Sequence, residues 1–479
     1  MIRTPLFRWA CLCAGVSACA MADEASQTGR TLRGERTALD RYVAAPDSSF
    51  KYELANSFTA GGCTVSVIRL TSQTWLTEKE VDRPVWQHWL SIIRPAEVAH
   101  DTGFLFISGG SSDKPAPTKV DESALLIAAT TKSVAAVLSN VPAQPLVFAG
   151  ETERRSEDSL IAYTWDKFLR TGDEKWPARL PMTKAAVRAM DAVTGFCATE
   201  EGGKATVSKF FVMGGSKRGW TTWTTAAVDE RVVAIAPAVI DTLNVGPSLR
   251  GHFETYGFFA PSLNDYTEQK IVDWSGTPEM KKLQKIEDPF EYRERLTLPK
   301  FIINAAGDQF FPTDSARHYF DELSGVKYIR AVPNADHGLK GSDAWVTLMA
   351  CYDAILKGSA LPEFSWKSEG EDAVRVTAKT APTTVRLWQA TNPAARDFRL
   401  EAVGKIWTSS ELARESDRSW IGRVARPEKG WTAYFVELTF PGPGSAPFTF
   451  TTVPRVFPDV FPHTWVERTP PAKTPPAGS

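Results

Sequence analysis

The chain has 479 residues, of which 43% are hydrophobic and 23% are charged, and its formal net charge is −1. This length favours two domains, and this composition is typical of a soluble protein with a large core. The near-zero charge gives no basis for attraction to nucleic acid or to an anionic membrane, which argues against both as partners.

The N-terminus has the features of a secretory signal. Arg3 and Arg8 precede a short apolar stretch over residues 9–16, and Ala20-Met21-Ala22 supplies a small-residue cleavage site. We therefore expect residues 1–22 to be a signal peptide and the protein to be exported, either periplasmic or secreted. A competing interpretation is a bacterial lipobox ending at Cys19, which would add a lipid anchor. After residue 22 no run reaches the ~18 apolar residues that a membrane span needs.

Three cysteines remain outside the signal: Cys63, Cys197 and Cys351. Export permits a disulfide, and three cysteines allow at most one internal pair, which the sequence does not identify. Their spacing matches no zinc-binding pattern, so we predict no metal site. No motif indicates a cofactor.

The chain opens with β-structure over about residues 39–93, including alternating strands at 63–70 and 87–95. The apolar run 103–108 predicts another strand, and Gly109, Gly110 and Ser111 follow it. In α/β-hydrolases a glycine-bearing loop at this place offers backbone N–H groups to the nucleophile. A simple Gly-Gly turn is the alternative.

The next region alternates helices and strands. The patterns predict helices over 121–138, 160–170 and 183–194, a short strand over 145–150 and a charged loop over 151–158.

A strand–turn–helix sequence then places a serine at its tip. The apolar run from Lys209 ends in Gly214-Gly215-Ser216, and a helical segment reaches Val228. This is the context of a nucleophile elbow with the pattern Gly-x-Ser-x-Gly. Arg218 stands where the second glycine is expected, and Gly219 comes one residue later. A plain turn is the alternative for this stretch taken alone.

Buried strands continue on both sides of an insertion. The run 231–240 is apolar throughout, as a strand covered on both faces would be. Residues 243–296 are rich in aromatic and charged side chains, and we predict a lid or cap there, with packing outside the sheet as the alternative. A strand from 299 ends at Asp308, a helix follows over 315–323, and a strand over 326–332 precedes His337. The rhythm predicts an α/β domain over 39–360 with a mostly parallel sheet.

Ser216, Asp308 and His337 each follow a predicted strand, in the chain order of the α/β-hydrolase triad. A serine hydroxyl needs a base to take its proton, and the base needs a carboxylate to orient it. We assign these roles to His337 and Asp308, with Asp314 and Asp336 as alternative acids. The backbone N–H groups of Lys217 and Gly110 are the expected oxyanion donors.

The composition changes after residue 360. Short strands are predicted at 373–379, 384–389, 398–403, 431–440 and 448–452, with turn signals between them. This spacing indicates a small β-sandwich domain over 364–460. The segment 461–479 ends in a proline-rich run and is predicted to be a disordered tail.

The chain resembles the PhoPQ-activated pathogenicity-related protein family over about residues 39–460. The resemblance is carried by the runs 166–169, 176–191, 214–220, 304–311, 386–393 and 430–433. It implies an exported α/β-hydrolase-like domain followed by a β-rich domain, and it implies little about the substrate.

The elbow alone also resembles the Gly-x-Ser-Arg-x-Gly motif of glucuronoyl esterases. By that analogy Lys217 or Arg218 would support the oxyanion or hold a substrate carboxylate, and we take Arg218 as the substrate-binding candidate. The alternative is a solvated basic pair at the start of a helix.

Together these features predict a serine hydrolase, an esterase or a peptidase, that acts on a small-molecule or peptide substrate through an acyl-enzyme. A catalytically inactive hydrolase-fold protein with a binding or signalling role is the second hypothesis. The departure at Arg218, the aromatic insertion and the β-rich C-terminal part motivate this alternative.

Overall fold

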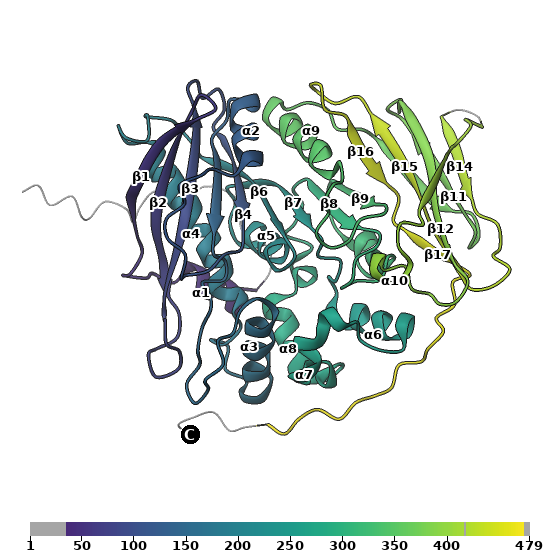
Figure 1. Cartoon of the computed structure of the whole chain (residues 1–479), viewed down its shortest axis with the longest axis horizontal. Helices are drawn as coiled ribbons and strands as arrows, with labels where there is room; N and C mark the ends of the chain where they lie inside the picture. Colours follow the sequence, from purple (N-terminus) through teal and green to yellow (C-terminus); the bar gives the residue numbers. More distant parts are fainter. Residues whose placement is uncertain (1–34, 416–417, 474–479) are drawn as a thin grey trace, which may run out of the picture. The chain divides into compact units, whose positions relative to one another are not determined.

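The computed structural model describes residues 35–415 and 418–473 (Figure 1). The predicted signal at 1–22, with the alternative lipid anchor at Cys19, lies outside the described residues, as does the segment 474–479. Within the described part of the chain, no helix combines the length and apolar character needed to cross a membrane.

A large mixed sheet organises the molecule, in the order β1-β2-β3-β5-β4-β6-β7-β8-β9-β16-β15-β12-β13, with β17 paired to β15. Its middle strands are parallel: β4 (Thr102–Ile107), β5 (Ala135–Ser139), β6 (Lys209–Gly215), β7 (Val232–Ala238), β8 (Lys300–Ala305) and β9 (Lys327–Val332). Antiparallel strands precede them: β1 (Lys51–Ala60), β2 (Cys63–Thr74) and β3 (Val85–Pro95). All residues of β8 are buried, as expected for a strand covered on both faces.

Helices cover the two faces of this sheet (Figure 1). One apolar core joins the sheet to α1 (Ala38–Ala44), α3 (Glu157–Thr171), α4 (Arg179–Cys197) and α5 (Lys217–Val228). The opposite face packs on α2 (Glu122–Thr131) and α9 (Ala344–Lys357). The predicted class, an α/β-hydrolase-like mostly parallel sheet, is confirmed.

One predicted helix is wrong in its extent. The helix expected over 121–138 ends at Thr131, where Lys132 takes a left-handed conformation with φ 52°. Strand β5 starts three residues later, at Ala135. The run Ala135-Ala136-Val137-Leu138 is apolar and suits a helix or a buried strand, so periodicity alone does not separate the two.

The insertion at 243–296 forms a helical layer. It contains α6 (Val245–Tyr256), η1 (Pro261–Leu263), α7 (Asn264–Glu268), η2 (Ile271–Trp274), α8 (Pro278–Glu287) and η3 (Pro289–Tyr292). We call residues 243–296 the cap. The helix predicted after Asp308 is instead two short 3-10 turns, η4 (Ser315–His318) and η5 (Phe320–Glu322).

The C-terminal part is built from two packed sheets. The small antiparallel sheet contains β10 (Phe364–Ser368), β11 (Ala373–Ala378) and β14 (Ser419–Arg423). The other strands are β12 (Thr384–Asn392), β13 (Thr408–Glu411), β15 (Trp431–Phe440), β16 (Phe448–Thr451) and β17 (Arg455–Phe457). These continue the main sheet, because Thr451 in β16 pairs with Ile329 in β9. The strand predicted over 398–403 is instead the short helix α10 (Leu400–Val403).

The segment 461–473, predicted to belong to a disordered tail, lies along the cap. The Trp465 ring packs 5.6 Å from Phe253 and 6.4 Å from Phe259, centroid to centroid. Arg468 pairs with Asp273 at 3.4 Å. The packing of Trp465 provides apolar burial that the proline-rich composition of this segment does not indicate.

The three cysteines are all buried and free. The disulfide that export permits is therefore not formed among Cys63, Cys197 and Cys351. Metal-binding groups of three or more His, Cys, Asp or Glu side chains are not found within residues 35–415 and 418–473.

Candidate active site

Ser216 sits in a sharp turn between β6 and α5. Its backbone adopts φ 57° and ψ −128°, a conformation that L-residues rarely take. The Ser216 N–H donates to the carbonyl of Ala238 at the end of β7, which fixes the turn on the sheet. A Cβ added at Gly214 would lie 2.5 Å from the carbonyl oxygen of Arg218. Only glycine therefore allows the helix to start so close to the strand.

The irregular elbow motif has a steric explanation. Gly219 packs against β7, where an added Cβ would meet the Ala238 carbonyl oxygen at 2.9 Å. The side chain of Arg218 extends beside Gly109, where an added Cβ would be 2.8 Å from the guanidinium. A side chain at position 109 would therefore shift the guanidinium of Arg218, which stands where the usual motif has its second glycine.

Arg218 is buried and its polar atoms are engaged within the chain. Nε donates to the carbonyl oxygen of Val141 at 2.5 Å, and Nη1 and Nη2 bind the two Glu157 carboxylate oxygens at 2.6 and 2.5 Å. The guanidinium is thus held in a bidentate pair, the geometry in which arginine binds a carboxylate most specifically. The carboxylate that Arg218 was expected to take from a substrate is supplied here by Glu157.

Lys217 joins the same network. Its Nζ lies 2.9 Å from Glu157 and 3.0 Å from Asp158. Burial alone raises the pKa of Glu157, but hydrogen bonds and charge from Arg218, with those from Lys217, outweigh burial and lower the pKa to about 2. Glu157 also has φ 53° at the first position of α3. It is ionised throughout the physiological range, and together with Asp158 it balances the charges of the two cations beside the serine.

Asp308 and His337 come together at the ends of neighbouring strands β8 and β9. Nδ1 of His337 lies 2.8 Å from Oδ2 and 3.1 Å from Oδ1 of Asp308. The backbone N–H of His337 donates to Oε1 of Gln309, and the imidazole packs 4.4 Å from the Phe310 ring, centroid to centroid. Nε2 of His337 is buried and has no hydrogen-bond partner among the described residues, so no bond to Ser216 is formed.

The two alternative acids lie in other networks. Asp314 is buried and pairs with Arg396 at 2.6 Å and with Arg317 at 3.2 Å. Asp336 accepts a hydrogen bond from the N–H of Gly338. The structure therefore brings Asp308, and neither alternative, to the imidazole.

The two expected oxyanion donors lie at different strand ends. Lys217 is the first residue of α5, so its backbone N–H has no acceptor within the helix. Gly110 follows β4 with φ 155°, and its carbonyl accepts from Nε2 of Gln144 at 3.0 Å. An added Cβ at Gly110 would be 2.9 Å from the backbone nitrogen of Asn140. Because β4 and β6 are adjacent and parallel, both loops leave the same edge of the sheet.

A pocket beside Ser216 is roofed by the cap. Cap side chains, including Val245, Leu249 and Tyr266, line it together with Ser216 and Lys217. The cap therefore covers the serine, which is the first of the two alternatives for residues 243–296.

Sequence reasoning missed Glu157, which it placed in a charged loop. Its side chain meets Arg218 and Lys217 across about sixty residues of sequence, a separation at which no local pattern reports contact. It also missed the pocket residues Trp165 and Trp220, whose helical spacing reads as ordinary core. A cation pair directly after the serine was the available signal that a carboxylate partner was needed.

Comparisons with known proteins identify the family to which the chain is related. Residues 39–399 match the PhoPQ-activated pathogenicity-related protein family. Autocrine proliferation repressor protein A from Dictyostelium discoideum is 36% identical over 428 residues, which is 84% of this chain and 86% of that protein.

Solved structures with a similar fold are more distant. An acetyl xylan esterase from Paenibacillus sp. R4 has a TM-score of 0.46 and 14% identity, covering 67% of this chain and 91% of that one. A glucuronoyl esterase from Solibacter usitatus has a TM-score of 0.38 and 15% identity, covering 67% of this chain and 90% of that one. The Pyrococcus horikoshii acylaminoacyl peptidase has a TM-score of 0.38 and 13% identity, covering 64% of this chain and 49% of that one.

Proposed function

Because the chain belongs to the PhoPQ-activated pathogenicity-related protein family and has an α/β-hydrolase-like fold, we propose that it is an exported serine hydrolase. It cleaves an ester or peptide bond through an acyl-enzyme on Ser216. The observation that carries the proposal is the 2.8 Å contact between His337 and Asp308, at the sheet edge where the strained Ser216 turn also lies.

Each residue has a defined step. Nε2 of His337 takes the proton of Ser216 as the serine oxygen bonds to the acyl carbon, and the same proton passes to the leaving group as the scissile bond breaks. Asp308 keeps the other ring nitrogen protonated and stabilises the imidazolium. The N–H groups of Lys217 and Gly110 stabilise the oxyanion. Water then releases the acyl group by the same route in reverse.

A fluorophosphonate probe tests this proposal directly. Wild type should be labelled and should hydrolyse esters or amides, while Ser216→Ala should lose labelling and about 10⁶-fold in rate. Ser57→Ala, an exposed serine on β1, is the matched control and should behave as wild type. Undiminished labelling of Ser216→Ala, or no labelling of wild type, refutes the assignment.

A second candidate is a binding or signalling protein that keeps the scaffold without chemistry. Two observations favour it: Nε2 of His337 has no partner among the described residues, and the 36% identical relative is named an autocrine proliferation repressor. This candidate predicts that Ser216→Ala retains full biological activity. Loss of that activity in a folded Ser216→Ala protein excludes it.

Export is proposed from residues 1–22. Cleavage after Ala22 leaves Asp23 as the new N-terminus, whereas lipidation leaves a modified Cys19. Mass analysis of the N-terminal peptide of the exported protein distinguishes the two. An unprocessed Met1 on all of the protein contradicts both.

A further inference from the structure

The cavity next to Ser216 is small and mostly apolar. Its volume is about 70 Å³. Its apolar wall includes Trp165, Trp220, Ile240, Leu249, Phe310 and Phe311. Such a surface favours a hydrocarbon group and gives a charged group no compensation for its lost hydration.

The charged side chains that reach the cavity already have partners of opposite charge. Lys217 pairs with Asp158 at 3.0 Å, and Arg179 pairs with Glu287 at 3.2 Å. Burial lowers the pKa of His252 to about 3, so this imidazole is neutral above that pH. A substrate carboxylate would have to break one of these buried pairs, which is costly.

We propose that this cavity is the acyl pocket and that it selects short, uncharged acyl groups, an inference that rests on the proposed hydrolase function. A cavity of about 150 Å³ holds benzene with its six carbons. By proportion, the cavity of about 70 Å³ next to Ser216 holds roughly three carbon atoms beyond the reacting carbonyl. Acetyl to butyryl esters fit this space, and hexanoyl and longer groups overfill it.

A series of 4-nitrophenyl esters tests the size limit. We expect kcat/KM to fall by about 10-fold or more for each methylene added beyond butyrate. The hemisuccinate ester, with four carbons like butyrate but a carboxylate at its end, should react at least about 100-fold more slowly than butyrate. A flat profile to octanoate, or a hemisuccinate rate equal to that of butyrate, overturns the proposal.

Shortening one side chain of the cavity wall should raise the acyl length that the cavity accepts. Leu249 lies on cap helix α6 and lines the cavity, so Leu249→Ala should shift the preferred ester toward hexanoate. Leu356→Ala, a half-buried leucine in α9, is the matched control and should keep the wild-type profile. If fluorophosphonate labels Ser216 but the profile is flat, only the acyl pocket is refuted. If neither labelling nor hydrolysis occurs, the hydrolase function falls as well.

A separate observation concerns the connection between β12 and β13, residues 393–407. Its Leu400 N–H donates to the carbonyl of Gly307, directly before Asp308. The side chain of Asn334, in the loop that leads to His337, donates to the carbonyl of Trp407 at 2.9 Å and accepts from the Trp407 N–H at 3.0 Å. The C-terminal part therefore contacts both loops that present the acid and the base.

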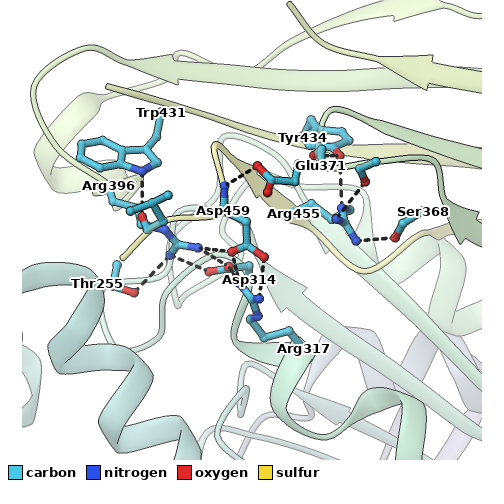
Figure 2. Close-up of polar contacts among 12 residues, drawn as sticks. Thr255, Asp314, Arg317, Ser368, Glu371, Arg396, Trp431, Tyr434, Arg455 and Asp459 are labelled. Carbon is cyan, nitrogen blue, oxygen red and sulfur yellow. Dashed lines mark hydrogen bonds and ion pairs between the residues drawn. The ribbon is translucent and has the colours of Figure 1, made fainter. Parts of the chain in front are cut away.

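The same connection reaches the cap through a buried arginine. Figure 2 shows the guanidinium of Arg396 between Asp314 and Thr255, a residue of cap helix α6. Arg396 is 1% exposed. Asp314 also binds Arg317, which in turn binds Asp459 at 2.7 and 2.8 Å. This network joins the connection, the loop after Asp308 and the cap.

We infer that Asn334 and Arg396 are positioning residues, through which the C-terminal part orients the Asp308–His337 pair and the cap. In this role they act on the proposed catalytic pair and not on the substrate. Removing them should alter catalytic geometry in protein that is still folded.

Asn334→Gly is a clean perturbation because Asn334 has φ 55°, a conformation that glycine adopts without strain. The variant loses both side-chain hydrogen bonds to Trp407. We expect kcat per fluorophosphonate-titrated site to fall about 10-fold, and the low-field proton signal of the His337 Nδ1–H bond to broaden or disappear. The proton signal reports geometry even if no substrate is found. An unchanged signal and an unchanged kcat overturn the inference.

Arg396→Met tests the cap branch. Because Arg396 contacts Thr255 on α6, we expect KM to rise several-fold in addition to a lower kcat. Arg455→Met is the matched control (Figure 2): Arg455 bonds Ser368 and Tyr434, all within the C-terminal sheets. A purely structural role predicts that both variants lower the melting temperature and leave kcat per titrated site unchanged, which would refute positioning by Arg396.

Discussion

Substitution of Glu157 tests most directly whether its carboxylate holds the elbow cations Arg218 and Lys217 in place. Glu157→Gln keeps the size of the side chain and removes the charge that pairs with Arg218, while Lys217 keeps its pair with Asp158. The guanidinium of Arg218, whose side chain is 10% exposed, would then lie beside Gly109 without a carboxylate. We expect a lower stability and a less ordered turn at Ser216.

The size of the effect follows from burial. Breaking a fully buried ion pair costs about 3–5 kcal/mol, whereas an exposed pair contributes about 0–1 kcal/mol. The Glu157 side chain is 43% exposed and that of Arg218 is 10% exposed, so solvent screening places the loss between these limits, at about 2 kcal/mol. For a cooperative unit of more than 400 residues this corresponds to a melting temperature lower by roughly 2 °C.

The pH dependence of Glu157→Gln has a defined sign. The pKa of Glu157 is lowered to about 2 in the folded protein. The stabilisation is therefore fully present above the ordinary glutamate pKa of about 4.3 and is lost as the pH falls toward 2. The difference in melting temperature between wild type and Glu157→Gln should be constant from pH 6 to 8 and should shrink below pH 4.5.

Thermal unfolding followed by circular dichroism measures both effects. Glu97→Gln is the control, because Glu97 pairs with Lys132 on the surface with side chains 70% and 56% exposed, and it should change the melting temperature by less than about 1 °C. If Glu157→Gln has the same melting temperature as wild type at pH 7, the elbow cations are held by something other than Glu157, and the stabilising role assigned to this carboxylate is wrong. The same holds if the double variant Glu157→Gln/Arg218→Met shows no coupling between the two sites.

Three further predictions concern the surroundings of the site. Burial raises the pKa of Asp241 to about 8. The folded protein therefore retains a proton that the unfolded chain releases near pH 4, and the free energy of unfolding falls by about 1.4 kcal/mol per pH unit from about pH 4 to 8. Asp241→Asn can still accept the 2.6 Å hydrogen bond from Tyr319, so it should gain stability relative to wild type as pH rises. If the free energies of unfolding of variant and wild type change with pH in parallel, this prediction is wrong. Gly214→Ala places a Cβ 2.5 Å from the Arg218 carbonyl oxygen and should abolish folding of the elbow. The control Gly276→Ala meets no atom within 4 Å, and because the φ of Gly276 is 79° it should lower the free energy of unfolding by only about 1 kcal/mol. Equal melting curves for the two variants would refute the steric argument. The three buried cysteines should react with a thiol reagent only after unfolding, and rapid labelling of the native protein would show that at least one is accessible.

The order of the site residues was predictable from sequence because each one follows a continuous apolar strand. Parallel strands end at one edge of a sheet, so the loops that carry Ser216, Asp308 and His337 leave the same edge once their strands are recognised. The pairing of Asp308 with the imidazole remained a choice among three carboxylates. It was decided by the partners of the other two, which only tertiary structure reveals.

The same reasoning fails where one composition suits two structures. Residues 135–138 read as helix but form β5, and residues 398–403 read as strand but contain α10. The C-terminal sheet also looked independent, since its hairpin spacing carries no trace of the Thr451–Ile329 pairing that joins it to β9. Long-range pairing of this kind is set by register and burial, not by local pattern.

The departure of the elbow from the usual motif is best understood as one coupled change. An arginine at position 218 needs space, which Gly109 provides, and a counter-charge, which Glu157 provides from a strained backbone position. The three depend on one another: a side chain at 109 would displace the guanidinium, and a neutral residue at 157 would leave the buried Arg218 without a carboxylate and Lys217 with Asp158 alone. The cations beside Ser216 are therefore better placed to hold the β4, α3 and α5 segments together around the serine than to attract a charged substrate, in keeping with an acyl pocket for uncharged groups.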